Sequence, residues 1–173
     1  VPSPERLLVI AQAFRHGLTV DEVNAASKYD PWFLEQFSNI IKVEEKIRKD
    51  GLPNNAPELL KIKKMGFSDE RIAELTNGTA AHVLQIRKSL NVHPVYKRVD
   101  TCAAEFPSKT PYMYSTYAGD GVNLPQCEAE PSDHRKVVIL GGGPNRIGQG
   151  IEFDYCCVHA TYSTKEAGYE AIM

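Results

Sequence analysis

The chain has 173 residues, of which 42% are apolar and 24% charged, with a formal net charge of −2. This composition is typical of a globular protein and excludes a disordered, collagen-like or disulfide-dense chain. The net charge gives no reason to expect a nucleic-acid or membrane partner, and no apolar run approaches the roughly 20 residues that span a bilayer. Because the chain begins with Val1, we expect a fragment or a processed product.

Residues 1–92 have the periodicity of a helical bundle. In the first expected helix, Ser3 has the place of the capping residue and Pro4 that of the first helical residue, and Gly17 ends the pattern. The apolar face predicted for this helix consists of Leu7, Leu8, Ala11 and Phe14.

Further helices follow after short links, as a compact bundle requires. Thr19 and Glu22 have the spacing of a capping box for the second helix. Asp30 and Pro31 open a third that ends at Gly51, and the remaining helices are expected at residues 57–65, 68–75 and 79–90. Helical spacing in the third helix relates Phe33, Phe37, Ile40, Ile41, Glu44 and Ile47. The sequence leaves open whether Phe33, Phe37 and Ile40 lie in the core or at an interface.

Residues 93–136 predict an extended connector. Pro94 ends the last helix, and four further prolines are expected to block regular structure: Pro107, Pro111, Pro125 and Pro131. Tyr112, Tyr114 and Tyr117 make the segment too aromatic for a solvated linker. We expect these tyrosines to pack along a surface between two domains, with stacking on a ligand as the alternative.

Residues 137–173 predict the first βαβ unit of a doubly wound fold. Val137 to Leu140 read as a buried strand, the glycine-rich residues 141–150 as a loop, residues 151–167 as a helix and residues 169–173 as a second strand. Two strands and one helix cannot bury a core alone. The predicted fold class is therefore mainly α: a helical bundle, then an extended connector, then a truncated α/β segment.

The glycine loop matches neither of two phosphate-binding motifs. Gly141 and Gly143 supply the first two glycines of the dinucleotide fingerprint, but Arg146 occupies the place of the third. Gln149 stands where a P-loop has its lysine, so the charge that binds phosphate is missing. A phosphate bound by this loop is therefore disfavoured.

Two carboxylates, Glu152 and Asp154, lie in the first turn of the helix after the loop. They can simply stabilise the helix start, where the dipole favours negative charge. Alternatively, one carboxylate faces a cavity and binds a small polar substrate, with Arg146 as its counter-charge. The four cysteines lack zinc-finger spacing, so we expect buried, reduced thiols and no metal site.

The segment of residues 137–160 resembles the large subunit of carbamoyl-phosphate synthetase at the start of its second synthetase half. Residues 93–106 and 112–117 resemble the connecting segment of that subunit, and the preceding helices are similar to its oligomerisation domain, most clearly at Trp32, Phe33 and Leu34. The resemblance covers essentially the whole chain. It implies a helical oligomerisation domain at residues 1–92, a connector at residues 93–136 and the start of a pre-ATP-grasp-like α/β domain at residues 137–173.

The resemblance also implies a function. The family's full subunit makes carbamoyl phosphate from bicarbonate, ammonia and two ATP with Mg²⁺ or Mn²⁺, and a glutaminase small subunit supplies the ammonia. In that family the glutamate equivalent to Glu152 lines a tunnel for carbamate, and Asn145 and Arg146 are further candidates in the loop. No ATP-grasp lid or metal-binding carboxylate pair is expected in this chain, and the family's regulatory nucleotide site belongs to a C-terminal domain. We therefore expect a cytoplasmic, self-associating fragment without catalytic activity of its own.

Two alternatives come from the residues themselves. The helices at residues 68–75 and 79–90 imitate a helix-turn-helix, whose second helix would present His82, Gln85, Arg87 and Lys88 to nucleic acid. A free-standing nucleotide-binding βαβ domain is the other alternative.

Overall fold

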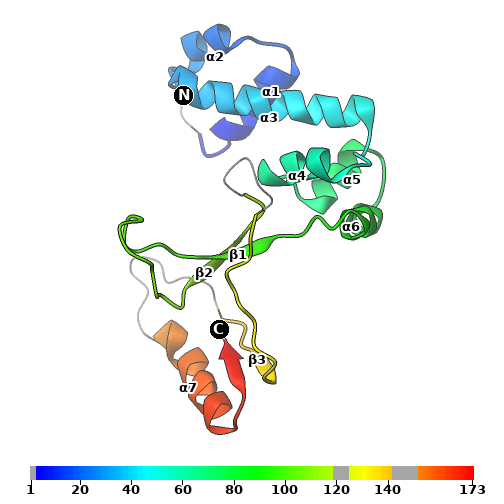
Figure 1. Cartoon of the computed structure of the whole chain (residues 1–173). Coiled ribbons are helices and arrows are strands. Elements are labelled where there is room, and N and C mark those ends of the chain that lie inside the picture. The colour runs from blue at the N-terminus through cyan, green and yellow to red at the C-terminus, as the bar shows by residue number, and fades with distance from the viewer. Residues whose placement is uncertain (1–2, 119–124, 142–151) are drawn as a thin grey trace. The chain divides into compact units, whose positions relative to one another are not determined.

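The computed structural model describes residues 3–118, 125–141 and 152–173 (Figure 1). The chain forms two compact units, Val1–Ala129 and Glu130–Met173. The first holds six helices and an antiparallel strand pair in its described part, and the second holds one helix and two parallel strands. The predicted mainly α class is therefore confirmed.

The first core is formed by α1 (Arg6–Arg15), α2 (Val20–Ser27) and α3 (Pro31–Asp50). Its buried residues are Ile10, Phe14, Val23, Leu34 and Ile41. The predicted start of α1 is wrong, because Glu5 stands at its N-cap position without a side-chain cap and the Ser3 carbonyl accepts the Arg6 amide. The predicted face is also partly wrong, because α1 packs through Ile10 and Phe14 and leaves Leu7 and Leu8 exposed.

Local signals fix the ends of these helices as predicted. Thr19 and Glu22 form both hydrogen bonds of the capping box before α2. Asp30 caps α3 by accepting the Trp32 amide at 2.8 Å, and Pro31 is its first residue. Gly17 follows α1 with φ of +85°, a conformation that a residue with a Cβ adopts only with strain.

The second core lies among α4 (Ala56–Lys64), α5 (Asp69–Leu75), α6 (Ala80–Ser89) and the C-terminal half of α3. Asn55, Ser68 and Thr79 cap the three shorter helices with their side chains. The buried residues of this core are Ile47, Leu59, Leu60, Ile62, Phe67, Ile72, Ala73, Leu75, Val83 and Val92. The predicted positions of these helices are confirmed.

The connector contains a strand pair that the proline pattern did not predict. β1 (Val95–Arg98) pairs with β2 (Met113–Thr116) in antiparallel register. The prolines flank these strands rather than interrupt them, so no ladder hydrogen bond is lost. Glu128 extends the arrangement, because its carboxylate accepts the Arg98 amide and pairs with Lys97.

In the second unit, β3 (Lys136–Val138) pairs in parallel with β4 (Glu170–Ile172), and α7 (Glu152–Glu166) connects them. The predicted βαβ order is therefore present. The predicted burial of the first strand is wrong: Val138 is exposed, and Leu140 just beyond it is 90% exposed. One helix covers only part of a two-stranded sheet, so the apolar strand residues lack a second layer.

Candidate association surface

The site residues predicted from sequence fall almost entirely outside the described part of the chain. Asn145 and Arg146 lie outside the described residues, and Glu152 is described only as the first residue of α7. At the start of the loop, a Cβ on Gly141 would lie 3.2 Å from Cys157 Sγ of α7. A residue with a Cβ at this position would therefore require the Cys157 side chain to shift by a few tenths of an ångström.

The N-terminal half of α3 presents apolar side chains to solvent. Trp32 and Phe33 are 60% and 53% exposed, and Ile40 is also exposed, two turns after Phe33. The rings of Trp32 and Phe33 lie edge to face with centroids 4.9 Å apart. We call Trp32, Phe33 and Ile40 the α3 surface. The question that sequence left open is answered for these side chains: Phe33 and Ile40 are outside the core, whereas Phe37 is half-buried against it.

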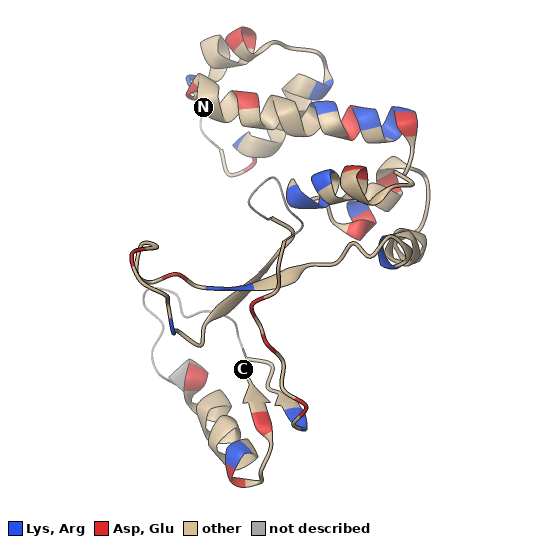
Figure 2. Ribbon diagram, in the orientation of Figure 1, with Lys and Arg blue, Asp and Glu red and all other residues tan. Residues whose placement is uncertain are grey.

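Charge is distributed unevenly along α3. Lys and Arg occur only in its C-terminal half, as Figure 2 shows, while Glu35 is the single charged residue among residues 31–41. An apolar surface that carries little charge is the usual composition at the centre of a protein interface. The geometry therefore suits contact with another protein surface better than contact with a charged ligand.

A buried ionic cluster joins α4, α5 and α6, the last three described helices of the first unit. Lys63 Nζ donates to Asp69 Oδ1 at 2.8 Å and to the Phe67 carbonyl at 2.7 Å. Arg87 donates to Asp69 Oδ2 at 3.1 and 3.2 Å. Burial raises the pKa of Asp69, but the hydrogen bonds from Lys63 and Arg87 outweigh it, so the pKa lies below its ordinary value.

Tyr117 attaches the end of β2 to this cluster. Lys63 Nζ lies 5.3 Å from the centre of the Tyr117 ring, and the ring packs against the second core. Burial raises the pKa of the Tyr117 hydroxyl. Tyr112 and Tyr114 are exposed, so within the described residues only one of the three tyrosines packs against the helical core.

The cluster also bears on the helix-turn-helix alternative. Arg87, one of the four side chains expected to face nucleic acid, is held by Asp69 and by the Val92 carbonyl, and its side chain is mostly buried. It is therefore not available to a phosphate, and His82, Gln85 and Lys88 alone give a weak electrostatic footprint.

The described residues offer no metal site or membrane span. None of their His, Cys, Asp and Glu side chains gather in a group of three that could hold a metal ion. Among the helices described, none is long and apolar enough to cross a bilayer. All four cysteines are unpaired, but Cys127 and Cys156 are exposed, so the prediction that the thiols are buried is wrong for these two.

Comparison with known families decides the relationship. Residues 1–91 match the family described as carbamoyl-phosphate synthetase large chain, oligomerisation domain. The chain belongs to the carbamoyl-phosphate synthetase large-chain family. Residues 133–173 match a second description, the carbamoyl phosphate synthase preATP-grasp domain, which falls within the second unit. The resemblance seen in the sequence is thus confirmed.

Relatives in this family match the chain from end to end. It is 62% identical over 172 residues to the carbamoyl phosphate synthase large chain of Brucella melitensis, and 58% identical over 172 residues to that of Rhizobium meliloti. The large chain of Pasteurella multocida is 54% identical over 173 residues. Each match covers 99% of this chain but only 15 or 16% of the relative, so the chain spans about one sixth of a synthetase large chain.

Proposed function

We propose that the helical part of the chain, residues 1–92, associates with a second copy of itself through the α3 surface; we call this part the helical unit. The observation that carries this proposal is the exposure of Trp32 and Phe33, side by side at the start of α3, within the residues that match an oligomerisation domain. A two-fold axis through such a surface places it against itself, which is the commonest arrangement in homo-oligomers.

Light scattering on a sizing column, across a range of protein concentrations, tests this association. A dimer or larger species that dissociates on dilution supports the proposal. A monomer at the highest concentrations contradicts it, and means that the helices act as a spacer.

We propose a linking role for the rest of the chain. Residues 1–92 associate, residues 93–136 connect, and residues 137–173 begin the α/β domain of the carbamoyl-phosphate-forming half. The full protein would make carbamoyl phosphate from bicarbonate, glutamine-derived ammonia and two ATP, with a glutaminase small subunit as partner. The unpaired cysteines fit a cytoplasmic location, where thiols stay reduced.

We infer that the described residues form no site for ATP with Mg²⁺ or Mn²⁺. They contain no group of three carboxylate, histidine or cysteine side chains for a metal ion, and the glycine loop has Gln149 in place of the P-loop lysine. We therefore assign nucleotide binding to other parts of the full subunit and expect the isolated chain to lack synthetase activity. Bicarbonate- or carbamate-dependent ATP hydrolysis by the isolated chain would refute this assignment.

We propose that Glu152 contributes to the carbamate tunnel of the full enzyme, with Asn145 and Arg146 nearby in the loop. The support is the position of Glu152 at the start of α7, directly after the glycine loop. Glu152→Gln in the full large chain should lower carbamoyl phosphate formation more than glutamine hydrolysis. Equal loss of both activities would argue for a purely structural role.

A further inference from the structure

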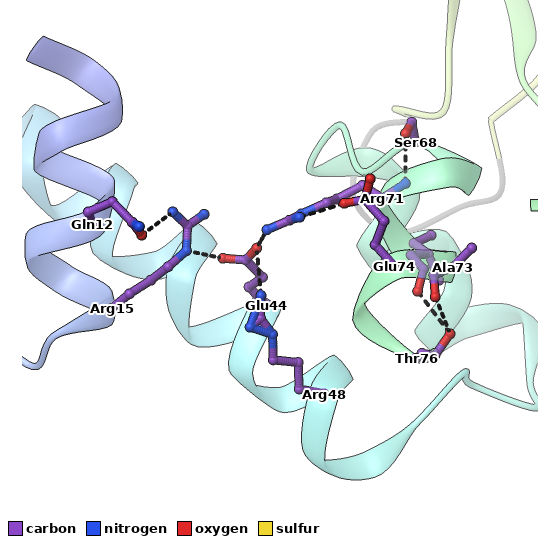
Figure 3. A network of polar contacts seen from close by, with 10 residues as sticks. Gln12, Arg15, Glu44, Arg48, Ser68, Arg71, Ala73, Glu74 and Thr76 are labelled. Carbon is purple, nitrogen blue, oxygen red and sulfur yellow. Dashed lines mark hydrogen bonds and ion pairs between the residues drawn. The ribbon is translucent and has the colours of Figure 1, made fainter. Parts of the chain in front are cut away.

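Glu44 is a buried carboxylate at which three helices meet (Figure 3). It lies on α3, and its side chain is 3% exposed. Arg15 Nε of α1 donates to Glu44 Oε2 at 2.8 Å, and Arg71 Nη2 of α5 donates to Glu44 Oε1. Arg48, one turn further along α3, has its Nη2 3.6 Å from Glu44 Oε1. We call these four residues the Glu44 hub.

The arginines from the neighbouring helices are held in place by further contacts. Gln12 Oε1 accepts a hydrogen bond from Arg15 Nη1 at 2.8 Å, and Glu74 Oε2 accepts one from Arg71 Nη1 at 2.6 Å. Figure 3 shows Arg15 and Arg71 reaching Glu44 from opposite directions. The Glu44 carboxylate is thus the shared counter-charge of three arginines. Its removal would leave their guanidinium groups close together without a negative charge between them.

The hub lies between the two cores of the helical unit. Leu34 and Ile41, which precede Glu44 on α3, belong to the first core. Ile47, the next buried residue after Glu44, belongs to the second. The two cores are separate clusters with no buried residue in common, so the helical unit has no continuous apolar core that would make it unfold as one body.

We propose that the helical unit consists of two separately cooperative halves, and that Glu44 is the positioning residue that couples them. The first half is α1, α2 and the N-terminal part of α3, and the second is the C-terminal part of α3 with α4, α5 and α6. The coupling is ionic, and the three arginine side chains are between 33 and 48% exposed. Added salt reaches and screens such partly exposed pairs, so the coupling weakens as ionic strength rises.

This coupling gives the two halves a means of affecting each other. The α3 surface lies on the first half, and the connector continues from the second. A role for Glu44 in relating self-association to the connector rests on the proposed function. The coupling itself does not, so the experiment below tests it independently of association.

Hydrogen exchange of the 173-residue chain, followed by mass spectrometry, tests the coupling. Glu44→Gln keeps the shape of the side chain and removes its charge. We expect exchange of the α1 and α2 amides to rise at least tenfold, because the first core has fewer buried residues than the second. Exchange in α4 and α6 should change less than twofold. Glu45→Gln is the matched control, since Glu45 is the next residue on α3, is exposed and lies outside the Glu44 hub, and it should leave all helices unchanged.

The dependence of amide exchange on salt concentration distinguishes ionic coupling from a purely structural role of Glu44. Raising NaCl from low to molar concentration should increase exchange in α1 and α2 of the wild type. This increase should be absent or reversed in Glu44→Gln, where salt screens only the repulsion among the arginines. If Glu44→Gln does not fold, Arg15→Gln removes only the link to α1 and should give the same selective increase.

A uniform increase across all six helices, or no increase, would overturn the proposal. Repeating the measurement at two protein concentrations separates it from association. A failed self-association would leave the selective exchange pattern intact.

Discussion

Phe33→Ser tests the association surface most directly. An aromatic side chain buries about 200 Å², so the 53% of Phe33 that is exposed offers on the order of 100 Å² to a partner. At roughly 25 cal/mol per Å², this area contributes about 2.5 kcal/mol per copy, or about 5 kcal/mol in a symmetric dimer. The dimer Kd should then rise by about a thousandfold or more, and still by about sixtyfold if only half of the area is buried.

Sedimentation or light scattering over a dilution series measures this Kd. Phe106→Ser is the matched control, because Phe106 is the same residue type, 69% exposed, and lies outside α3. The unfolding free energy of the monomer should change by less than about 1 kcal/mol in both variants, since both sites are exposed. The reasoning is refuted if Phe33→Ser dimerises like the wild type, or if Phe106→Ser weakens the dimer equally.

Other predictions concern the folding of the helical unit. Thr19→Ala removes the capping box before α2 and should cost about 1 kcal/mol in urea unfolding; no change would mean that α2 needs no cap. Leu59→Ala opens a cavity at a fully buried site and should cost about 2–5 kcal/mol, visible as a lower Tm. The pKa of Asp69 is lowered in the fold, so the unfolded chain binds this proton more readily, and the stability from Asp69 is present above about pH 4 and lost below it. Asp69→Asn should be less stable than the wild type at pH 7, with the gap closing in acid; parallel pH profiles would contradict this.

The helices were predictable because their signals are local. A capping side chain and the amide it accepts lie within three residues of each other, as at Thr19 and Asp30. The error in α1 has a different origin. A helical period fits several neighbouring stripes, and only packing on α3 selects Ile10 and Phe14 over Leu7 and Leu8. The strands β1 and β2 were missed because prolines beside a strand and prolines inside one look alike in composition.

The Glu44 hub and the α3 surface depend on residues that are far apart in the sequence. Glu44 fits the apolar stripe of α3 by spacing, but the two arginines that donate hydrogen bonds to it lie 29 residues before it and 27 after it. Likewise, helical spacing groups Phe33 with Ile41, and only the position of the neighbouring helices separates the exposed residue from the buried one. The burial expected for Val138 requires a second layer over its sheet, which the chain does not itself provide among its described residues.

The uncovered sheet of the second unit has a consequence for the behaviour of the chain in solution. β3 and β4 pair only with each other in the described structure, so each has an outer edge of unpaired backbone groups next to exposed apolar side chains. Such edges recruit strands from other molecules, and each added strand presents a new edge. Growth of this kind has no fixed stoichiometry, unlike the proposed two-fold contact through α3, which closes at two copies. A single preparation is thus open to two routes of assembly. The proposed dimerisation stops at two copies, whereas strand addition continues until the protein precipitates.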